Sequence, residues 1–180
     1  MCNQLRSLAE CPECPTTTTL LLQKNKELET IHEFFFDSMT QLRVLDLHHT
    51  KIQSLPPSII KLVKLKSLYL NECWGLVSLS EHLGKLTNLE ILDIRNTGLQ
   101  SLPTVVAQLV SLRCLRVSFV YDHNNEDNQP RQIIPHNVIG LLYHLEELTI
   151  IVDPREQSWN DVVTSVVEEI TNLESLTTLF

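Results

Sequence analysis

The sequence predicts an α/β solenoid, a curved stack of similar units with a parallel β-sheet along its hollow side. Three observations lead to this fold class. Leucine occupies 32 of the 180 positions, far more than a globular chain ordinarily contains. The motif Leu-x-x-Leu-x-Leu returns at intervals of 23 or 24 residues, which suits one repeating supersecondary unit. Two units also carry a Leu-Pro pair after the motif.

The units follow one another along most of the chain. Their starts lie near residues 17, 42, 65, 89, 112 and 145, with a truncated unit at 176. One unit cannot bury its own apolar face, so neighbouring units must stack to form a continuous core. We therefore expect a single domain over residues 1–180. Because both ends fall inside units, we also expect a fragment of a longer solenoid or a truncated product.

Within each unit, strand alternation predicts which side chains point inward. The leucines of the motif face the core, and the residues between them line a parallel sheet on the concave side. Asn25, Thr50, Cys73 and Thr97 follow these strands. Such small side chains can bond buried backbone groups of the turn. The rest of each unit predicts an irregular or short-helical convex side.

Two segments depart from the repeat. Residues 118–135 contain the polar run Asp122 to Gln129, which predicts a loop insertion that could also contact a partner. From Ser158 to Ile170, apolar side chains recur every three or four residues. This spacing predicts one longer amphipathic helix near the C-terminus, packed on the convex side.

Several runs resemble a known family. They are Cys14-Pro15 to Leu22-Gln23, Phe35-Phe36, Met39, Leu42 to Leu47, Thr50, Ile52 and Leu55-Pro56. These runs resemble the leucine-rich repeats of plant intracellular immune receptors, especially the coiled-coil, nucleotide-binding class of disease resistance proteins. The resemblance implies a leucine-rich repeat solenoid in the cytoplasm that recognises a protein partner, either a pathogen effector or a host protein. It also implies an intramolecular contact with the nucleotide-binding domain of the full-length receptor.

Composition excludes several other functions. The net charge of −8 disfavours broad binding to nucleic acid or to anionic membranes. Only four glycines are present, and no phosphate-cradling loop can be found. No stretch predicts a membrane span or a secretory signal. No acid, base and nucleophile converge at a defensible spacing, so we expect no enzyme, no cofactor and no metal site.

Charge is divided unevenly along the chain. Residues 1–116 hold 12 basic and 11 acidic side chains, for a net charge of +1, whereas residues 117–180 hold two and 11, for −9. This asymmetry indicates two surfaces for two contacts. The resemblance implies that the N-terminal repeats meet the nucleotide-binding switch and the C-terminal repeats meet the ligand. An acidic face that only keeps the chain soluble is the alternative.

The concave face is the predicted protein-binding site, because strand geometry sets its side chains in rows. A central row holds Leu21, Asp46, Tyr69, Asp93, Arg116 and Thr149. The candidate binding residues are Asp46, His48, His49, Tyr69, Asn71, Glu72, Asp93, Arg95, Asn96 and Arg116. We expect Tyr69 and Arg95 to be the main anchors and Arg116 to pair with Asp93. An ordinary solvated sheet face is the alternative for any one of these residues.

Two function classes suit this face. The first is a recognition and autoinhibition module of a plant immune receptor that takes part in the defense response. The second is a generic intracellular scaffold or adaptor in signalling.

Overall fold

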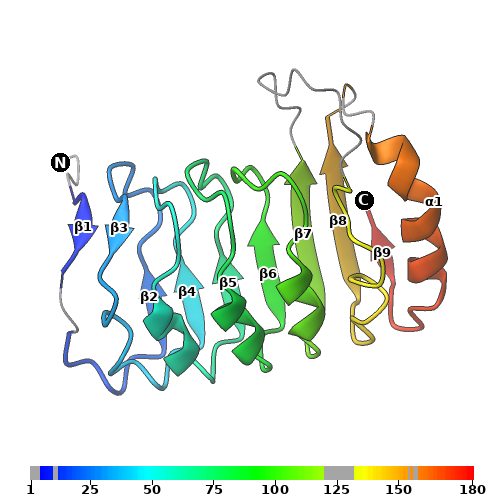
Figure 1. The fold of residues 1–180 in the computed structure, drawn as a ribbon. Helices are drawn as coiled ribbons and strands as arrows, with labels where there is room; N and C mark the ends of the chain where they lie inside the picture. The colour runs from blue at the N-terminus through cyan, green and yellow to red at the C-terminus, as the bar shows by residue number, and fades with distance from the viewer. Residues whose placement is uncertain (1–4, 10–11, 120–131, 154, 156–157) are drawn as a thin grey trace.

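A computed structural model describes residues 5–9, 12–119, 132–153, 155 and 158–180. These residues form a stack of parallel strands with short helices on one side and one longer helix near the C-terminal end (Figure 1). The predicted solenoid fold, including its short-helical convex side, is therefore confirmed.

Seven parallel strands make up the main sheet, in the order β2-β4-β5-β6-β7-β8-β9. Their bounds are β2 (Thr19–Leu21), β4 (Val44–Asp46), β5 (Ser67–Tyr69), β6 (Ile91–Ile94), β7 (Cys114–Phe119), β8 (Glu147–Val152) and β9 (Thr178–Leu179). A smaller parallel sheet pairs β1 (Ser7–Leu8) with β3 (Thr30–Ile31). Two neighbouring parallel strands must be joined by a crossover connection. Each strand of the main sheet, together with the connection that follows it, therefore forms one unit of the stack.

The core is built from leucines that stand opposite one another in neighbouring strands. Leu45 pairs in register with Leu68, which pairs with Leu92, then Leu115 and Leu148. All five side chains are fully buried. Each leucine therefore packs against its counterparts in the units before and after it, and no unit is self-sufficient.

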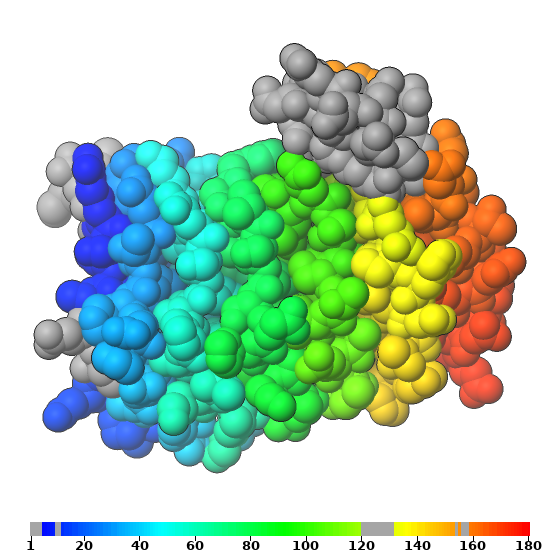
Figure 2. All heavy atoms as spheres, viewed as in Figure 1, coloured from blue at the N-terminus to red at the C-terminus, as the bar shows by residue number. Residues whose placement is uncertain are grey.

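Among the described residues, three 3₁₀ helices cover the convex side of the sheet. They are η1 (Pro57–Lys61), η2 (Glu81–Lys85) and η3 (Thr104–Gln108). Pro56 and Pro103 precede η1 and η3, where the fixed φ of proline favours a helix start. Before η2, Ser80 instead accepts a hydrogen bond from the backbone N–H of His82 at 3.2 Å, as an N-cap does. Figure 2 shows the same side as a continuous surface of successive units.

The longer helix, α1 (Ser158–Thr171), covers the convex side at the C-terminal end (Figure 1). Its Val162 and Val166 are buried in the core, so the apolar stripe packs inward as the sequence predicted. The Glu169 carboxylate ties the helix to the preceding unit by accepting hydrogen bonds from the backbone N–H groups of Asn137 at 2.6 Å and Gly140 at 2.9 Å.

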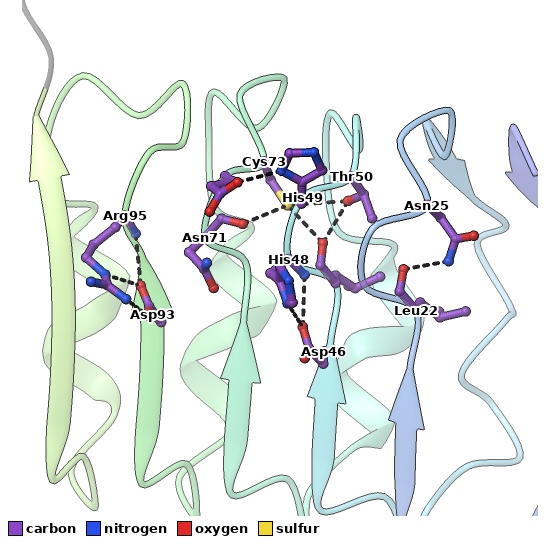
Figure 3. Close-up of polar contacts among 12 residues, drawn as sticks. Leu22, Asn25, Asp46, His48, His49, Thr50, Asn71, Cys73, Asp93 and Arg95 are labelled. Carbon is purple, nitrogen blue, oxygen red and sulfur yellow. Dashed lines mark hydrogen bonds and ion pairs between the residues drawn. The ribbon is translucent and has the colours of Figure 1, made fainter. Parts of the chain in front are cut away.

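A ladder of small side chains stabilises the turns after the strands (Figure 3). Asn25, Thr50 and Thr97 each donate to the backbone carbonyl three residues earlier, at 2.7, 2.9 and 3.0 Å. The Cys73 thiol instead donates to the carbonyl of Leu47 in the preceding unit at 3.1 Å. Because all four residues are buried, these contacts satisfy carbonyl groups that water cannot reach. This is the structural role predicted for them.

The residue before each ladder position has a left-handed backbone. The φ angles of Lys24, His49, Glu72 and Asn96 are 61°, 57°, 63° and 54°. Non-glycine residues enter this region at a cost of about 1–2 kcal/mol. In this conformation each of the four backbone N–H groups points toward the next unit. The first three donate to backbone carbonyls at 2.8 or 2.9 Å, and that of Asn96 donates to Ser118 Oγ at 2.7 Å.

Strand β7 extends two residues beyond the predicted start of the loop insertion. Ser118 and Phe119, expected to open the insertion over 118–135, continue β7 and pair with β8. Both side chains are buried, as are Ile133 and Ile134 at the far end. The reason is the burial of apolar surface, because the Phe119 side chain packs in the hydrophobic core. Residues 120–131, which hold the polar run, lie outside the described residues.

Replacing Leu68 by alanine tests the stacking. We expect the free energy of unfolding, measured in urea, to fall by about 2–5 kcal/mol, because a cavity opens in contact with two other units. Val77→Ala is the matched control, since Val77 is 67% exposed and its loss should change stability by no more than about 0.5 kcal/mol. Equal effects of the two substitutions would contradict a core built from this leucine row.

Candidate functional site: the concave sheet face

The concave face gathers the predicted side chains in rows across the sheet. The register places the central row Leu21, Asp46, Tyr69, Asp93, Arg116 and Thr149 on six consecutive strands. His48, Asn71 and Arg95 form a second row two residues further along the chain. Figure 3 shows Asp46 with His48 and Asp93 with Arg95 on this face. Strand β5, which carries Tyr69, lies between those two pairs.

Two histidines hold the carboxylates over β4 and β5. The Asp46 carboxylate accepts from the backbone N–H of His48 at 3.0 Å and lies 2.9 Å from its Nδ1. In the next unit, Glu72 Oε2 lies 2.5 Å from Nδ1 of His49. This hydrogen bond is the main reason that the pKa of Glu72 falls below its usual value, against a smaller opposing effect of burial. Both carboxylates are thus held in place by a neighbouring imidazole.

Asp93 holds the arginine over β6. It accepts from Arg95 Nε at 2.9 Å, from Nη2 at 2.6 Å and from the backbone N–H at 3.2 Å. This bidentate pairing raises the pKa of Arg95 and fixes the plane of its guanidinium. The Asp93 residue is only 2% exposed. Asp93 was predicted as a binding residue, but Arg95 covers it, so Asp93 supports the face rather than presenting itself to a partner.

Arg116 forms the predicted ion pair with Asp93 and a closer one with Glu147. Its Nε and Nη2 donate to Glu147 at 2.6 and 3.2 Å, whereas its Nη1 lies 3.8 Å from Asp93. Glu147 takes the closer contacts because Asp93 is already engaged by Arg95. Glu147 is not among the predicted binding residues, although the register indicates it: Arg116 stands opposite Thr149, which makes Glu147 a diagonal neighbour that a long side chain can reach.

The remaining predicted residues are less engaged. Tyr69 and Asn71 are half-buried, with Tyr69 standing between Asp46 and Asp93 in the register. Asn96 lies at the rim, where its Oδ1 accepts from the Ser118 hydroxyl at 3.4 Å. The structure therefore brings all ten candidates to one face or its rim, with Asp93 beneath the others.

Cys114 borders the arginine pair on β7. It is 8% exposed, and burial raises the pKa of its thiol to about 11. A thiol with so high a pKa is almost fully protonated at neutral pH, and the thiolate is the nucleophilic form. Cys114 therefore acts as a small packing side chain at this site.

In the described part of the chain, no group of three or more His, Cys, Asp or Glu side chains is placed to hold a metal ion. None of the helices in that part is long and apolar enough to cross a bilayer.

Comparison with known families decides the identity of the repeats. The family described as leucine-rich repeat region matches residues 61–180, and the family described as leucine rich repeat matches residues 15–74. The chain belongs to the leucine-rich repeat family. In this family the fold typically serves protein interaction rather than catalysis.

Curated relatives place this leucine-rich repeat chain near plant disease resistance proteins. All three relatives named here come from Arabidopsis thaliana. Probable disease resistance protein At1g12290 is 43% identical over 70 residues, which cover 38% of this chain and 8% of that protein. Disease resistance protein At4g27190 is 41% identical over 91 residues, covering 48% and 9%. Disease resistance protein SUMM2 is 42% identical over 73 residues, covering 40% and 8%.

The chain thus spans less than a tenth of the length of these relatives. Their names confirm the predicted resemblance to the repeat region of plant disease resistance proteins.

Solved structures agree on the fold of the leucine-rich repeat chain. An internalin (inlF) from Listeria monocytogenes superposes with a TM-score of 0.59 at 19% identity, covering 91% of this chain and 41% of that one. A TDR receptor gives a TM-score of 0.55 at 22% identity, covering 86% and 26%. At such low identity these similarities concern the solenoid fold alone.

The Arg116–Glu147 pair of the leucine-rich repeat chain should make its stability depend on pH. Hydrogen bonding to Arg116 lowers the pKa of Glu147 from its usual value of 4.5. A carboxyl group whose pKa is lower in the folded state stabilises the fold above the unfolded pKa, and this is lost as pH falls through the folded pKa. We therefore expect Glu147→Gln to lower the free energy of unfolding at pH 7 by about 0.5–1 kcal/mol, since the pair is partly exposed.

Urea denaturation between pH 7 and pH 3 measures this effect. The difference between wild type and Glu147→Gln should shrink as the pH falls below about 4.5, where the carboxyl group becomes protonated. Glu174→Gln serves as the control, because Glu174 is exposed in the turn before β9. A Glu147→Gln difference that stays constant across this pH range would contradict the assigned pair.

Proposed function

We propose that this leucine-rich repeat chain is the protein-recognition region of a plant immune receptor. In this proposal the concave face binds a pathogen effector or a modified host protein. The observation that carries the proposal is the row of side chains held across a continuous parallel sheet, from Asp46 through Tyr69 to Arg116. Aromatic and arginine side chains on a rigid base are the residues that dominate protein interfaces.

Preorganisation supports this assignment. Arg95, Arg116, Asp46 and Glu72 each have a fixed hydrogen-bond partner on the same face. Side chains that are already ordered lose less conformational entropy when a partner binds. The relatives named disease resistance proteins supply the biological context.

We further propose that the same chain restrains the nucleotide-binding domain of a longer receptor. The net charge of +1 over residues 1–116 and −9 over residues 117–180 suits two different contacts, because a near-neutral and a strongly acidic surface favour different partners. The near-neutral N-terminal repeats would meet the nucleotide-binding domain, and the C-terminal repeats would extend the ligand surface. Residues 1–180 act in this proposal as one domain in the cytoplasm, without an enzymatic role or a cofactor.

Alanine substitution of both Tyr69 and Arg95 tests recognition. Proteins captured by the chain from infected leaf extract should be compared, by quantitative mass spectrometry, with those captured by the double variant. We expect at least one effector or host protein to be lost, and its Kd for the purified chain to rise at least about 30-fold, as the loss of one strong anchor requires. Lys85→Ala on convex helix η2 is the control and should keep full affinity. Unchanged binding by the double variant would refute the concave face as the site.

Deleting the repeats from the longer receptor tests restraint. When expressed in leaf cells without pathogen, the receptor lacking residues 1–180 should cause cell death, measured as ion leakage. Its intact form should stay silent, because a domain that stabilises the inactive state shifts the equilibrium away from signalling. Co-expression of the chain as a separate polypeptide should reduce the leakage. A silent deletion variant that accumulates to normal levels would argue against autoinhibition.

A further inference from the structure

The charges on the concave face are exposed unequally along the sheet. Over β4 and β5 the acidic side chains Asp46 and Glu72 are 17% and 42% exposed. Over β6 and β7 the Arg95 and Arg116 side chains are each 33% exposed, the Asp93 side chain beneath them is 3% exposed, and the Glu147 side chain that pairs with Arg116 is 29% exposed. Carboxylates are therefore exposed over β4 and β5, whereas guanidinium groups are the more exposed charges over β6 and β7.

The acidic half is balanced by histidine rather than by permanent cations. The described partners of Asp46 and Glu72 are the imidazole rings of His48 and His49. Lys24 lies close enough to lower the pKa of Glu72, but no hydrogen bond or ion pair joins the two among the described contacts. A cation supplied by a partner would therefore find carboxylate oxygens available here.

The basic half retains unused donors. A guanidinium carries five N–H groups, and Asp93 takes those on Nε and one on Nη2 of Arg95. Glu147 likewise takes only Nε and Nη2 of Arg116. The remaining N–H groups suit a carboxylate, which pairs well with a guanidinium held in a fixed plane. Because the supporting Asp93 is buried, an anion that approaches Arg95 meets the guanidinium before it meets the Asp93 carboxylate.

Sheet geometry sets the distance between the two halves. Strands β4 and β6 are two steps apart in the sheet, which is roughly 10 Å at about 4.8 Å per step. Tyr69 stands between them on β5, where its ring can contact an apolar or cationic group. Two side chains on the same face of an extended segment are two or four residues apart, which is roughly 7 or 13 Å. Two that are seven residues apart on one face of a helix span about 10 Å.

We infer that the concave face binds a protein segment with a lysine or arginine over Asp46 and Glu72 and an aspartate or glutamate over Arg95 and Arg116, about 10 Å apart. The inference rests on the proposed function, because it names the partner chemistry of the same face. Charge complementarity carries it: one half of the face mainly exposes carboxylates and the other mainly exposes guanidinium groups, so a partner with one charge of each sign fits better than a uniformly acidic or basic one.

A library of random 12-residue peptides displayed on phage provides the probe. The library is selected on the whole 180-residue chain, and peptides that also bind the Tyr69→Ala, Arg95→Ala double variant are removed. The expected consensus among the remaining peptides contains one basic and one acidic residue, two or four positions apart in an extended peptide or seven apart in a helical one. A consensus that lacks either sign would overturn the inference while leaving the proposed binding face intact.

Charge exchange then tests each half. Glu72→Lys changes an exposed side chain, and we expect it to weaken the selected peptide about tenfold; a peptide with glutamate for its basic residue should regain this loss. In the other half, Asp93→Asn with Arg95→Gln removes both charges but keeps polar groups of similar size. This variant should also bind about tenfold more weakly. Urea denaturation confirms that each variant is folded.

The two possible failures are distinguishable. If no selected peptide depends on Tyr69 and Arg95, both the binding face and its charge preference are wrong. If such peptides exist but Glu72→Lys binds them as well as wild type does, or the exchanged peptide regains nothing, only the charge preference is wrong. Raising the NaCl concentration should weaken the selected peptides, because exposed charge pairs are screened by salt.

Discussion

The solenoid depends on the burial of each leucine row between neighbouring units. Leu45, Leu68 and Leu92 are fully buried only because each has a counterpart on both sides. Burial of one such side chain contributes about 1.5–3 kcal/mol, and the contribution is lost if a neighbouring unit moves away. The same packing that stabilises the core therefore holds the concave strands in a fixed register. This register sets the spacing of the polar side chains on the concave face.

The outer face uses this rigidity to keep charged side chains in order. Asp93 is nearly buried, yet Arg95 satisfies it with two side-chain hydrogen bonds. A buried carboxylate without such a partner would be strongly destabilising. The cost of burying Asp93 is thus offset by a guanidinium whose position is fixed on the surface. The same arrangement recurs more openly in Arg116 with Glu147 and in Glu72 with His49.

The sequence predicted those features of the structure that depend on the repeat period and on strand alternation. The fold, the central row that contains Asp46 and Tyr69, and the inward packing of α1 all follow from residue spacing. The ion-pair partners of the charged side chains could not be predicted in this way. A long side chain can reach several acceptors across a sheet, and its partner depends on which of them are already engaged. Alternation alone cannot show that Arg95 covers Asp93 or that Arg116 turns toward Glu147. The left-handed φ angles were also missed, since His49 and Glu72 have no sequence signal for them.

The left-handed row limits how this face can diversify. A β-branched residue such as valine or isoleucine at Lys24, His49, Glu72 or Asn96 would clash with its own backbone at a positive φ. Glycine, asparagine and aspartate tolerate that region best. Tyr69 and Arg116 sit on ordinary extended strands and face no such restriction. Among related chains, new binding specificities should therefore arise by free exchange in the strand rows, while the rim admits a narrower choice of side chains.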